Sequence, residues 1–276
     1  MQMQFPAPVI PFARRDARRG LFWLGQAFSM FRTAPLRWLL LIAVYYVIVA
    51  IVQLGPWPAL GKFAAAILKP VFAVGFLAAA WSQERGGNPV LADLFRGFRS
   101  NLWALLPLGL VFFAGMTLAV AATAVIDGGA LIAWAAGGED PSEEVLASGR
   151  LQLALLFGVA CALPTLLALW FAPALVVFHD AGALTALVAS LRAALANWRP
   201  VAVFGLAILF YGGIVPALGD ALMRLLDTTA GAVLRVGLLV PYVLIFLATF
   251  QISDYVAYRD VFHGDEPSPP GGDQAG

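Results

Sequence analysis

Few residues in this sequence are of types that could catalyse a reaction or bind a metal. The chain has two histidines, His179 and His263, and one cysteine, Cys161. His179 precedes Asp180, a pair that could sense protons, but a polar helix end is the simpler interpretation because no metal-binding or acidic cluster lies nearby. Cys161 lies in an apolar stretch, where a lone cysteine behaves as a small hydrophobic side chain. We therefore expect no enzyme activity, no catalytic residue, no metal site and no cofactor.

A charge inside an apolar segment is a stronger functional signal, because burying it in lipid is costly. Lys69 lies about ten residues into the second apolar stretch, next to Pro70. It is a candidate intramembrane polar site, either on a solute pathway or in a buried ion pair. The alternative is a shifted or shortened span that lets the ammonium group reach the interface.

A second cluster follows the last apolar stretch, where Asp254, Tyr255, Tyr258, Arg259 and Asp260 lie close together. Tyr255 and Arg259 are four residues apart and share one face of a helix. We interpret the cluster as an anchor for the last helix. In the alternative, Tyr255, Tyr258 and Arg259 contact lipid or a partner protein.

The elements that carry these residues are membrane spans. The sequence is 61% hydrophobic and 12% charged, whereas a soluble domain carries about 25% charged residues. A helix crosses a bilayer with about 20 apolar residues, and the alternating pattern of a β-barrel is absent. The predicted fold is all-α, a polytopic membrane helix bundle with six transmembrane helices. Their expected ranges are 36–54, 60–81, 102–126, 151–178, 201–218 and 233–252.

The segment Gly128–Gly137 is too short to span and either extends the third helix or lies in the interface. Glycines within spans usually permit close helix packing. We expect that role for Gly109, Gly115, Gly205, Gly212 and Gly213.

The distribution of basic residues sets the expected orientation. The ends and loops on the side of the N-terminus hold twelve of the seventeen Lys and Arg residues, and the opposite side holds five. We therefore expect a multi-pass protein of the bacterial inner membrane with both termini in the cytoplasm. Residues 1–19 form an N-terminal arm that is not a cleaved signal, residues 20–262 the membrane domain, and residues 263–276 a disordered tail. The net charge of +1 gives no general attraction to nucleic acid.

Three segments before the odd-numbered spans share one pattern, which indicates a threefold internal repeat. Each has apolar residues at i, i+3, i+4, i+7 and i+11, as on one helix face, and the even-numbered spans each carry a proline. The alternative to a repeat is that any six-span protein has amphipathic linkers and several prolines. The three faces are Leu24, Ala27, Phe28, Phe31 and Pro35; Leu91, Leu94, Phe95, Phe98 and Leu102; and Leu184, Leu187, Val188, Leu191 and Leu195, and the prolines are Pro70, Pro173 and Pro241.

These three segments are predicted to be cytoplasmic interfacial amphipathic helices, near Leu21–Arg32, Leu91–Asn101 and Ala183–Trp198. Their arginines would extend to lipid headgroups. The candidate lipid or partner contacts are Arg32, Arg96, Arg99 and Arg192.

Three stretches together resemble a family of six-span bacterial inner-membrane proteins without an established activity. They are Gly20–Leu24 with Phe31–Arg32 and Pro35–Trp38, Trp170–Val176 with Ser190–Trp198, and the ending Ser253–Phe262, whose Tyr-x-x-Tyr-Arg-Asp-x-Phe pattern is the most specific. The resemblance covers Val9 to Phe262. It implies a topology and a location, and no substrate or catalytic residue.

Two functions of different classes follow. The first is a non-catalytic protein that organises membrane lipids or a partner protein at the cytoplasmic face. The alternative is a small-solute transporter or channel with a pathway near Lys69. The spans hold few polar residues for such a pathway, chiefly Thr117, Thr123, Thr165 and Thr249.

Overall fold

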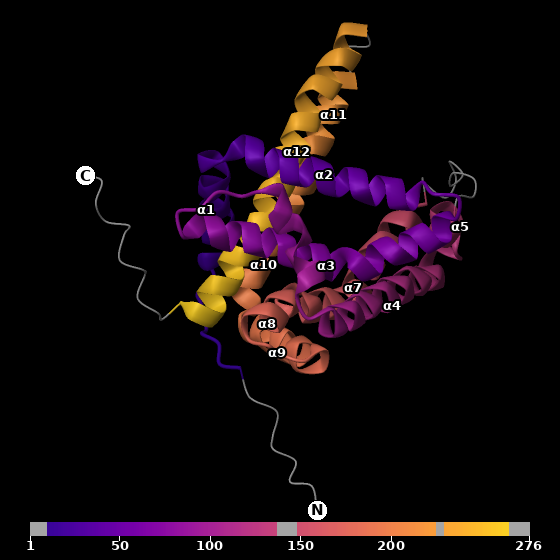
Figure 1. Ribbon diagram of the computed structural model, residues 1–276. Helices are drawn as coiled ribbons and strands as arrows, with labels where there is room; N and C mark the ends of the chain where they lie inside the picture. The colour runs from indigo at the N-terminus through magenta and orange to yellow at the C-terminus, as the bar shows by residue number, and fades with distance from the viewer. Residues whose placement is uncertain (1–9, 137–147, 225–228, 265–276) are drawn as a thin grey trace, which may run out of the picture. The chain divides into compact units, whose positions relative to one another are not determined.

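The structure is a computed structural model that describes residues 10–136, 148–224 and 229–264. Within these ranges the chain forms helices and their connections, and no strand is present (Figure 1). The helices are α1 (Arg19–Thr33), α2 (Pro35–Gln53), α3 (Pro58–Glu84), η1 (Leu91–Arg99), α4 (Leu102–Asp127), α5 (Ala130–Ala135), α7 (Arg150–Trp170), α8 (Ala172–Phe178), α9 (Ala183–Ala196), α10 (Trp198–Leu209), η2 (Phe210–Ile214), α11 (Val215–Arg224) and α12 (Thr229–His263).

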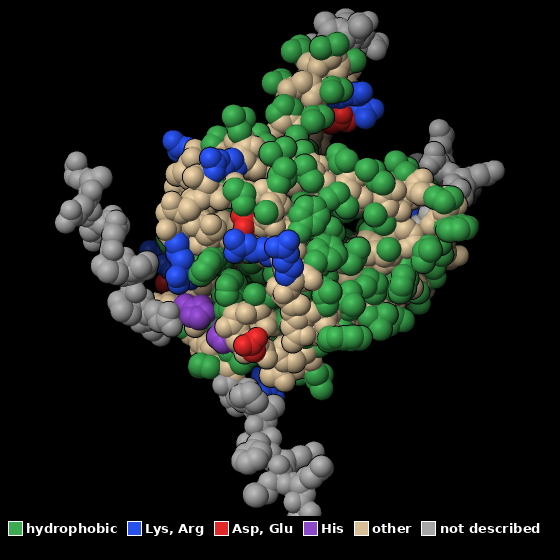
Figure 2. All heavy atoms as spheres, viewed as in Figure 1, with side chains coloured by type: hydrophobic (Ala, Val, Ile, Leu, Met, Phe, Trp, Pro, Cys, Tyr) green, Lys and Arg blue, Asp and Glu red, His purple; other side chains and the backbone are tan. Residues whose placement is uncertain are grey.

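Six of the described helical stretches are long and apolar enough to cross a membrane. The prediction of an all-α bundle with six membrane helices is therefore confirmed. The stretches are Pro35–Gln53, Ala59–Glu84, Leu102–Asp127, Arg150–Phe178, Trp198–Arg224 and Gly231–His263. Large hydrophobic side chains are exposed along them (Figure 2), as expected of helices that a bilayer solvates.

The third span begins and ends with capping geometry that its sequence specifies. The Asn101 side chain accepts a hydrogen bond from the amide of Ala104 at 3.2 Å, which satisfies one of the free donors of the first turn. At the other end Gly128 adopts φ 66° and its amide donates to the carbonyl of Ala124, a left-handed helix stop that favours glycine. The span therefore ends at Asp127, and α5 is a separate helix. Residues 137–147 lie outside the described residues, as do residues 265–276 of the predicted tail.

The prolines of the even-numbered spans do not occupy equivalent positions. Pro70 and Pro241 lie inside α3 and α12, whereas Pro173 lies in the first turn of α8, after a break at Phe171. Proline fits the first turn because the amide that it lacks has no partner there. Pro107 and Pro164 lie inside α4 and α7. Matched interior prolines therefore give the repeat no support, and the repeat stays a prediction.

The chain divides into two compact units. The first comprises Met1–Val47, Ala73–Arg96 and Arg192–Gly276, and the second comprises Ile48–Phe72 and Gly97–Leu191. In the first unit α1 packs against α10 and α12, and α11 packs against α12. A Cβ at Gly20 would come within 2.3 Å of the carbonyl oxygen of Pro200, so the start of α1 requires glycine where it meets α10.

In the second unit α4 and α7 pack together through two reciprocal contacts between glycine and threonine. A Cβ at Gly115 of α4 would meet the side chain of Thr165 of α7, and one at Gly158 of α7 would meet Thr123 of α4. Small residues let membrane helices approach closely. The predicted close packing is also confirmed at Gly109, which meets Ile67, and in the first unit at Gly212, which meets Phe246.

The packing prediction was wrong for Gly205, where a Cβ would meet nothing within 4 Å, and a Cβ at Gly213 would meet only the side chain of Leu209. Both lie in the fifth span. Only 11% of the most apolar 18-residue segment of this span is buried. The side of this helix that carries Gly205 is therefore open rather than packed.

The second of the three short segments differs from its predicted form. η1 is a 3₁₀ helix, which has three residues per turn and aligns residues i and i+3. Leu94 and Gly97 are accordingly buried, while Phe95 and Phe98 are exposed. The face predicted from α-helical spacing is thus divided between a buried and an exposed side.

Candidate functional site

Asp260 is bound by several polar side chains of the first unit. Its carboxylate is buried, with a side-chain exposure of 3%. One oxygen accepts a hydrogen bond from the indole of Trp23 at 2.8 Å, and the Arg19 guanidinium pairs with both oxygens. This pairing with Asp260 raises the pKa of Arg19 above its ordinary value. A buried carboxylate needs such partners, because an unpaired charge in an apolar interior is strongly disfavoured.

The N-terminal arm is tied to the same point. The Arg15 guanidinium donates to the carbonyl oxygen of Asp260 at 2.7 and 2.9 Å, and the amide of Ala13 donates to the carbonyl of Val261 at 2.8 Å. The side chain of Asn197, between α9 and α10, accepts from the amide of Arg15 and donates to the carbonyl of Ala13. The arm from Ala13 to Arg19 thus joins the end of α12 to the start of α10.

Arg259 and Tyr255 extend from α12 toward the end of α3. Both reach the carboxylate of Glu84, Arg259 through an ion pair and Tyr255 through its hydroxyl. Arg259 also donates to the Gln26 side chain of α1 at 3.0 Å. The shared helix face predicted for Tyr255 and Arg259 is confirmed by their common partner, and the pair anchors α12 to α3 and α1.

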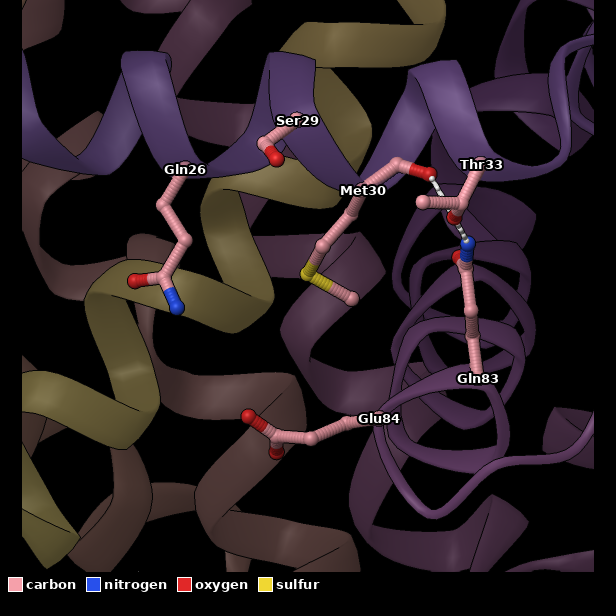
Figure 3. Close-up of a pocket in the computed structure, with 6 residues that line it drawn as sticks. All are labelled: Gln26, Ser29, Met30, Thr33, Gln83 and Glu84. Atoms are coloured by element: carbon pink, nitrogen blue, oxygen red, sulfur yellow. Dashed lines mark hydrogen bonds between the residues drawn. The ribbon is translucent and has the colours of Figure 1, made fainter. Parts of the chain in front are cut away.

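Next to Glu84, Gln83 ties α3 to α1 and α2. Its amide nitrogen donates to the carbonyl of Met30 and to the hydroxyl of Thr33, and its oxygen accepts from the indole of Trp38 at 2.8 Å. These two polar residues of α3 face a pocket of about 270 Å³, shown in Figure 3. The pocket is lined by Gln26, Ser29, Met30, Thr33, Gln83 and Glu84.

The predicted candidate contacts fall into two groups. Tyr255 and Tyr258 are buried, with residue exposures of 4% and 2%, and the Tyr258 hydroxyl lies 2.9 Å from Nε2 of His263. The arginines of the short helices, Arg32, Arg96, Arg99 and Arg192, are all exposed. Binding of lipid or a partner by either group stays a prediction.

One of these arginines has a structural partner of its own. Nε of Arg96 lies 2.9 Å from the carboxylate of Asp93, which is buried. The other Asp93 oxygen accepts from the amide of Val90 and caps the start of η1. Arg96 therefore stabilises the helix that carries it, and it differs in this respect from Arg32, Arg99 and Arg192.

Lys69 is the candidate intramembrane polar site of the sequence analysis. It belongs to the second unit, where its side chain is exposed and its ammonium lies 4.1 Å from the centroid of the Phe112 ring on α4. A cation over an aromatic face is stabilised by the ring's negative potential. This contact is one that the sequence did not indicate, because Lys69 and Phe112 lie in different spans.

Sequence analysis missed most of the polar cluster around Asp260 and Glu84. It grouped Asp260 with its neighbours but assigned it no partner, and it did not single out Glu84, Arg15, Trp23 or Asn197. Two signals were available: Glu84 and Gln83 are polar residues at the end of an apolar span, and Arg15 and Arg19 precede the first helix at a spacing of four. Neither signal names the partner, which comes from a distant part of the chain.

Comparison with known proteins gives one similar curated protein, a probable inner membrane protein of Burkholderia thailandensis. The two are 31% identical over 261 residues, which cover 92% of this chain and 95% of that protein. No protein-family profile and no solved structure matches the chain. The similarity extends over both units and all six apolar stretches.

Proposed function

We propose that this chain, which belongs to the family of the probable inner membrane protein of Burkholderia thailandensis, is a non-catalytic protein that organises anionic lipids at the cytoplasmic face. It is a multi-pass inner-membrane protein, and the short helices α1, η1 and α9 are the proposed lipid-binding elements. The observation that supports the proposal most is that each of them exposes large apolar side chains beside exposed arginines.

The helix α9 has this character in its clearest form. Its buried residues are the small Ala186, Ser190, Ala193 and Ala194, whereas Leu184 is 74% exposed and Leu195 is 55% exposed. A helix at a water-exposed surface would turn its leucines inward. The outward leucines suit a helix that lies in the membrane interface with its apolar side in the acyl boundary.

The helices α1 and η1 carry the same combination. Phe22 and Phe28 of α1 are 41% and 44% exposed, and Phe95 and Phe98 of η1 are 43% and 38% exposed. Arg32 and Arg99 lie on these two helices, and Arg192 lies on α9. Each arginine near an anionic leaflet contributes about 1 kcal/mol of attraction, so the three helices together would favour anionic lipid over neutral lipid.

The interior polar groups of the first unit support a structural role rather than catalysis. Glu84 and Asp260 are both paired with arginines, and the polar side chains around them connect helices to one another. Catalytic carboxylates, in contrast, need a pKa poised for proton transfer and access to substrate. The cluster is better suited to holding the short helices in place.

The experiment replaces one arginine on each short helix with glutamate, giving the variant Arg32→Glu, Arg99→Glu, Arg192→Glu. Arg96 is left in place because it pairs with the buried Asp93. The variant should insert normally, since the apolar spans drive insertion, and should co-purify with less anionic lipid than the wild type. If the lipid is unchanged but a protein is lost from the purified material, these helices bind a partner protein instead.

The alternative function is transport of a small solute along a path near Lys69. The observation in its favour is the exposed ammonium group in the second span, beside Phe112. Ionisable residues within spans often mark solute or proton pathways. A growth or uptake phenotype of Lys69→Ala would support this alternative.

A further inference from the structure

We propose that the pocket between α1 and the end of α3 binds the glycerol phosphate group of a phosphatidylglycerol molecule. The inference rests on the proposed function, because it names which anionic lipid one of the short helices recognises. The pocket lies entirely within the first unit, and Gln26, Ser29, Gln83 and Glu84 supply its polar lining.

The size of the pocket fits a lipid headgroup. Its volume of about 270 Å³ is slightly below the range of about 300–1,000 Å³ typical of sites for drug-sized ligands. Figure 3 shows Gln26 and Met30 extending from α1, with the carboxylate of Glu84 directed back beneath them. Ser29 is exposed on the same helix, so the recess is open to a ligand from outside.

The pocket lining still offers both hydrogen-bond donors and hydrogen-bond acceptors to a ligand. Within the described residues Gln83 uses its nitrogen and its oxygen on Met30, Thr33 and Trp38. Gln26 accepts from Arg259 through its oxygen, which directs its amide nitrogen away from that bond. Two donors are then available, the Gln26 amide nitrogen and the Ser29 hydroxyl. The Glu84 carboxylate, which can accept about four hydrogen bonds, has two partners, Arg259 and Tyr255.

The floor of the pocket favours an uncharged ligand group. Arg259 neutralises Glu84 inside, so the floor offers hydrogen bonds without net charge. Two exposed arginines adjoin lining residues in the sequence, Arg32 beside Thr33 and Arg85 beside Glu84. The Arg85 guanidinium lies 4.4 Å from the centroid of the Trp81 ring. Neither arginine lines the pocket, and we infer that a negative group of the ligand would lie outside it, with these two arginines as its proposed partners.

A glycerol phosphate group combines these features. Its two neighbouring hydroxyls can donate to Glu84 and accept from Gln26 and Ser29, while its phosphodiester would stay outside the pocket, where Arg32 and Arg85 are its proposed partners. Arginine pairs with phosphate groups through charge-assisted and often bidentate hydrogen bonds. The same group occurs in the membrane as phosphatidylglycerol and in solution as glycerol phosphate, and the proposal commits to the lipid.

The test is native mass spectrometry of the purified full-length chain with phosphatidylglycerol or phosphatidylethanol in the micelle. Both lipids carry one negative phosphodiester, but phosphatidylethanol lacks the two hydroxyls. Losing the hydrogen bonds of both hydroxyls predicts at least about tenfold weaker binding of phosphatidylethanol. The variant Ser29→Leu fills the pocket and should abolish this preference, and Ser29→Ala should reduce it. Gly25→Ala is the matched control, because a Cβ at Gly25 meets nothing within 4 Å.

The outcomes separate this inference from the proposed function. Equal binding of the two lipids by the wild type, or an unchanged preference in Ser29→Leu, would overturn the pocket assignment and leave anionic lipid binding intact. If neither lipid binds, the proposed function fails as well. A last measurement compares the binding of free glycerol phosphate in solution with that of the lipid. If it binds as tightly as the lipid, the chemistry of recognition is supported and the lipid source is overturned.

Discussion

Arg259 and Asp260 are adjacent in the sequence, and their side chains pair with opposite partners. Arg259 pairs with Glu84 at the end of α3, and Asp260 pairs with Arg19 at the start of α1. Consecutive residues of a helix point about 100° apart, so one dipeptide can engage two different elements. The end of α12 therefore holds α1, α3 and the N-terminal arm together.

The first prediction concerns Asp260. Replacing it with alanine leaves the buried indole of Trp23 without its acceptor and leaves Arg19, whose side chain is 36% exposed, without its carboxylate. An unsatisfied buried donor costs about 1–3 kcal/mol. We expect a lower free energy of unfolding in detergent and faster trypsin cleavage within the arm at Arg14 or Arg15. The control is Asp220→Ala, whose partner Arg224 is 66% exposed, and it should cost less than about 1 kcal/mol. Equal effects of the two substitutions would contradict the role of Asp260.

The second prediction tests the pair between Glu84 and Arg259. Glu84→Arg and Arg259→Glu should each destabilise the protein, because each places two like charges together. The double variant Glu84→Arg, Arg259→Glu restores opposite charges, and it should recover part of the loss, with a coupling of about 0.5–3 kcal/mol. Thermal unfolding of the four proteins in one detergent measures the cycle. Additive losses would show that the two side chains do not stabilise the fold through each other.

The third prediction concerns orientation, which follows from the twelve basic residues on one side and five on the other. A reporter that is active only in the periplasm should be active when it is inserted at Gly138. A reporter that is active only in the cytoplasm should be active when it is fused after Gly276. Activity patterns that place both points on the same side of the membrane would overturn the six-span topology.

The fourth prediction concerns Lys69. If the ammonium group has only a structural role, as in its contact with Phe112, Lys69→Ala should cost at most about 2 kcal/mol and leave growth and solute uptake unchanged. Lys62→Ala is the control, because Lys62 is also an exposed lysine of α3. An uptake defect confined to Lys69→Ala would favour transport over lipid organisation.

The helical spans were predictable from the sequence because the bilayer fixes both their length and their composition. The expected third span, 102–126, and the observed helix, Leu102–Asp127, differ by one residue. The sequence also placed α1 and α9 well, because their apolar spacing is that of a regular helix. For η1 the same spacing was misleading: the amide and carboxylate of Asp93 hold a tighter 3₁₀ turn at its start, and one apolar pattern is compatible with either helix type.

Long-range pairs were the part of the candidate site that the sequence could not provide. Asp260 and Trp23 are separated by 237 residues, and nothing local to either residue specifies the other. The helix face shared by Tyr255 and Arg259 was predictable from a spacing of four, but Glu84 as their joint partner was not. The pocket beside Glu84 depends on how α1 packs against the end of α3, so no sequence pattern predicts it.

The most direct test of the account measures the anionic lipid that co-purifies with the chain. Arg32→Glu, Arg99→Glu, Arg192→Glu is compared with Lys62→Glu, Arg150→Glu, Arg224→Glu. The second variant makes the same change in net charge at exposed residues that are predicted to lie on the opposite side of the membrane. Both variants are extracted in the same detergent at equal expression, and bound phospholipids are quantified by mass spectrometry. We predict that the first variant loses most of its anionic lipid and that the second keeps it. Equal lipid in the two variants and the wild type would contradict lipid organisation by α1, η1 and α9.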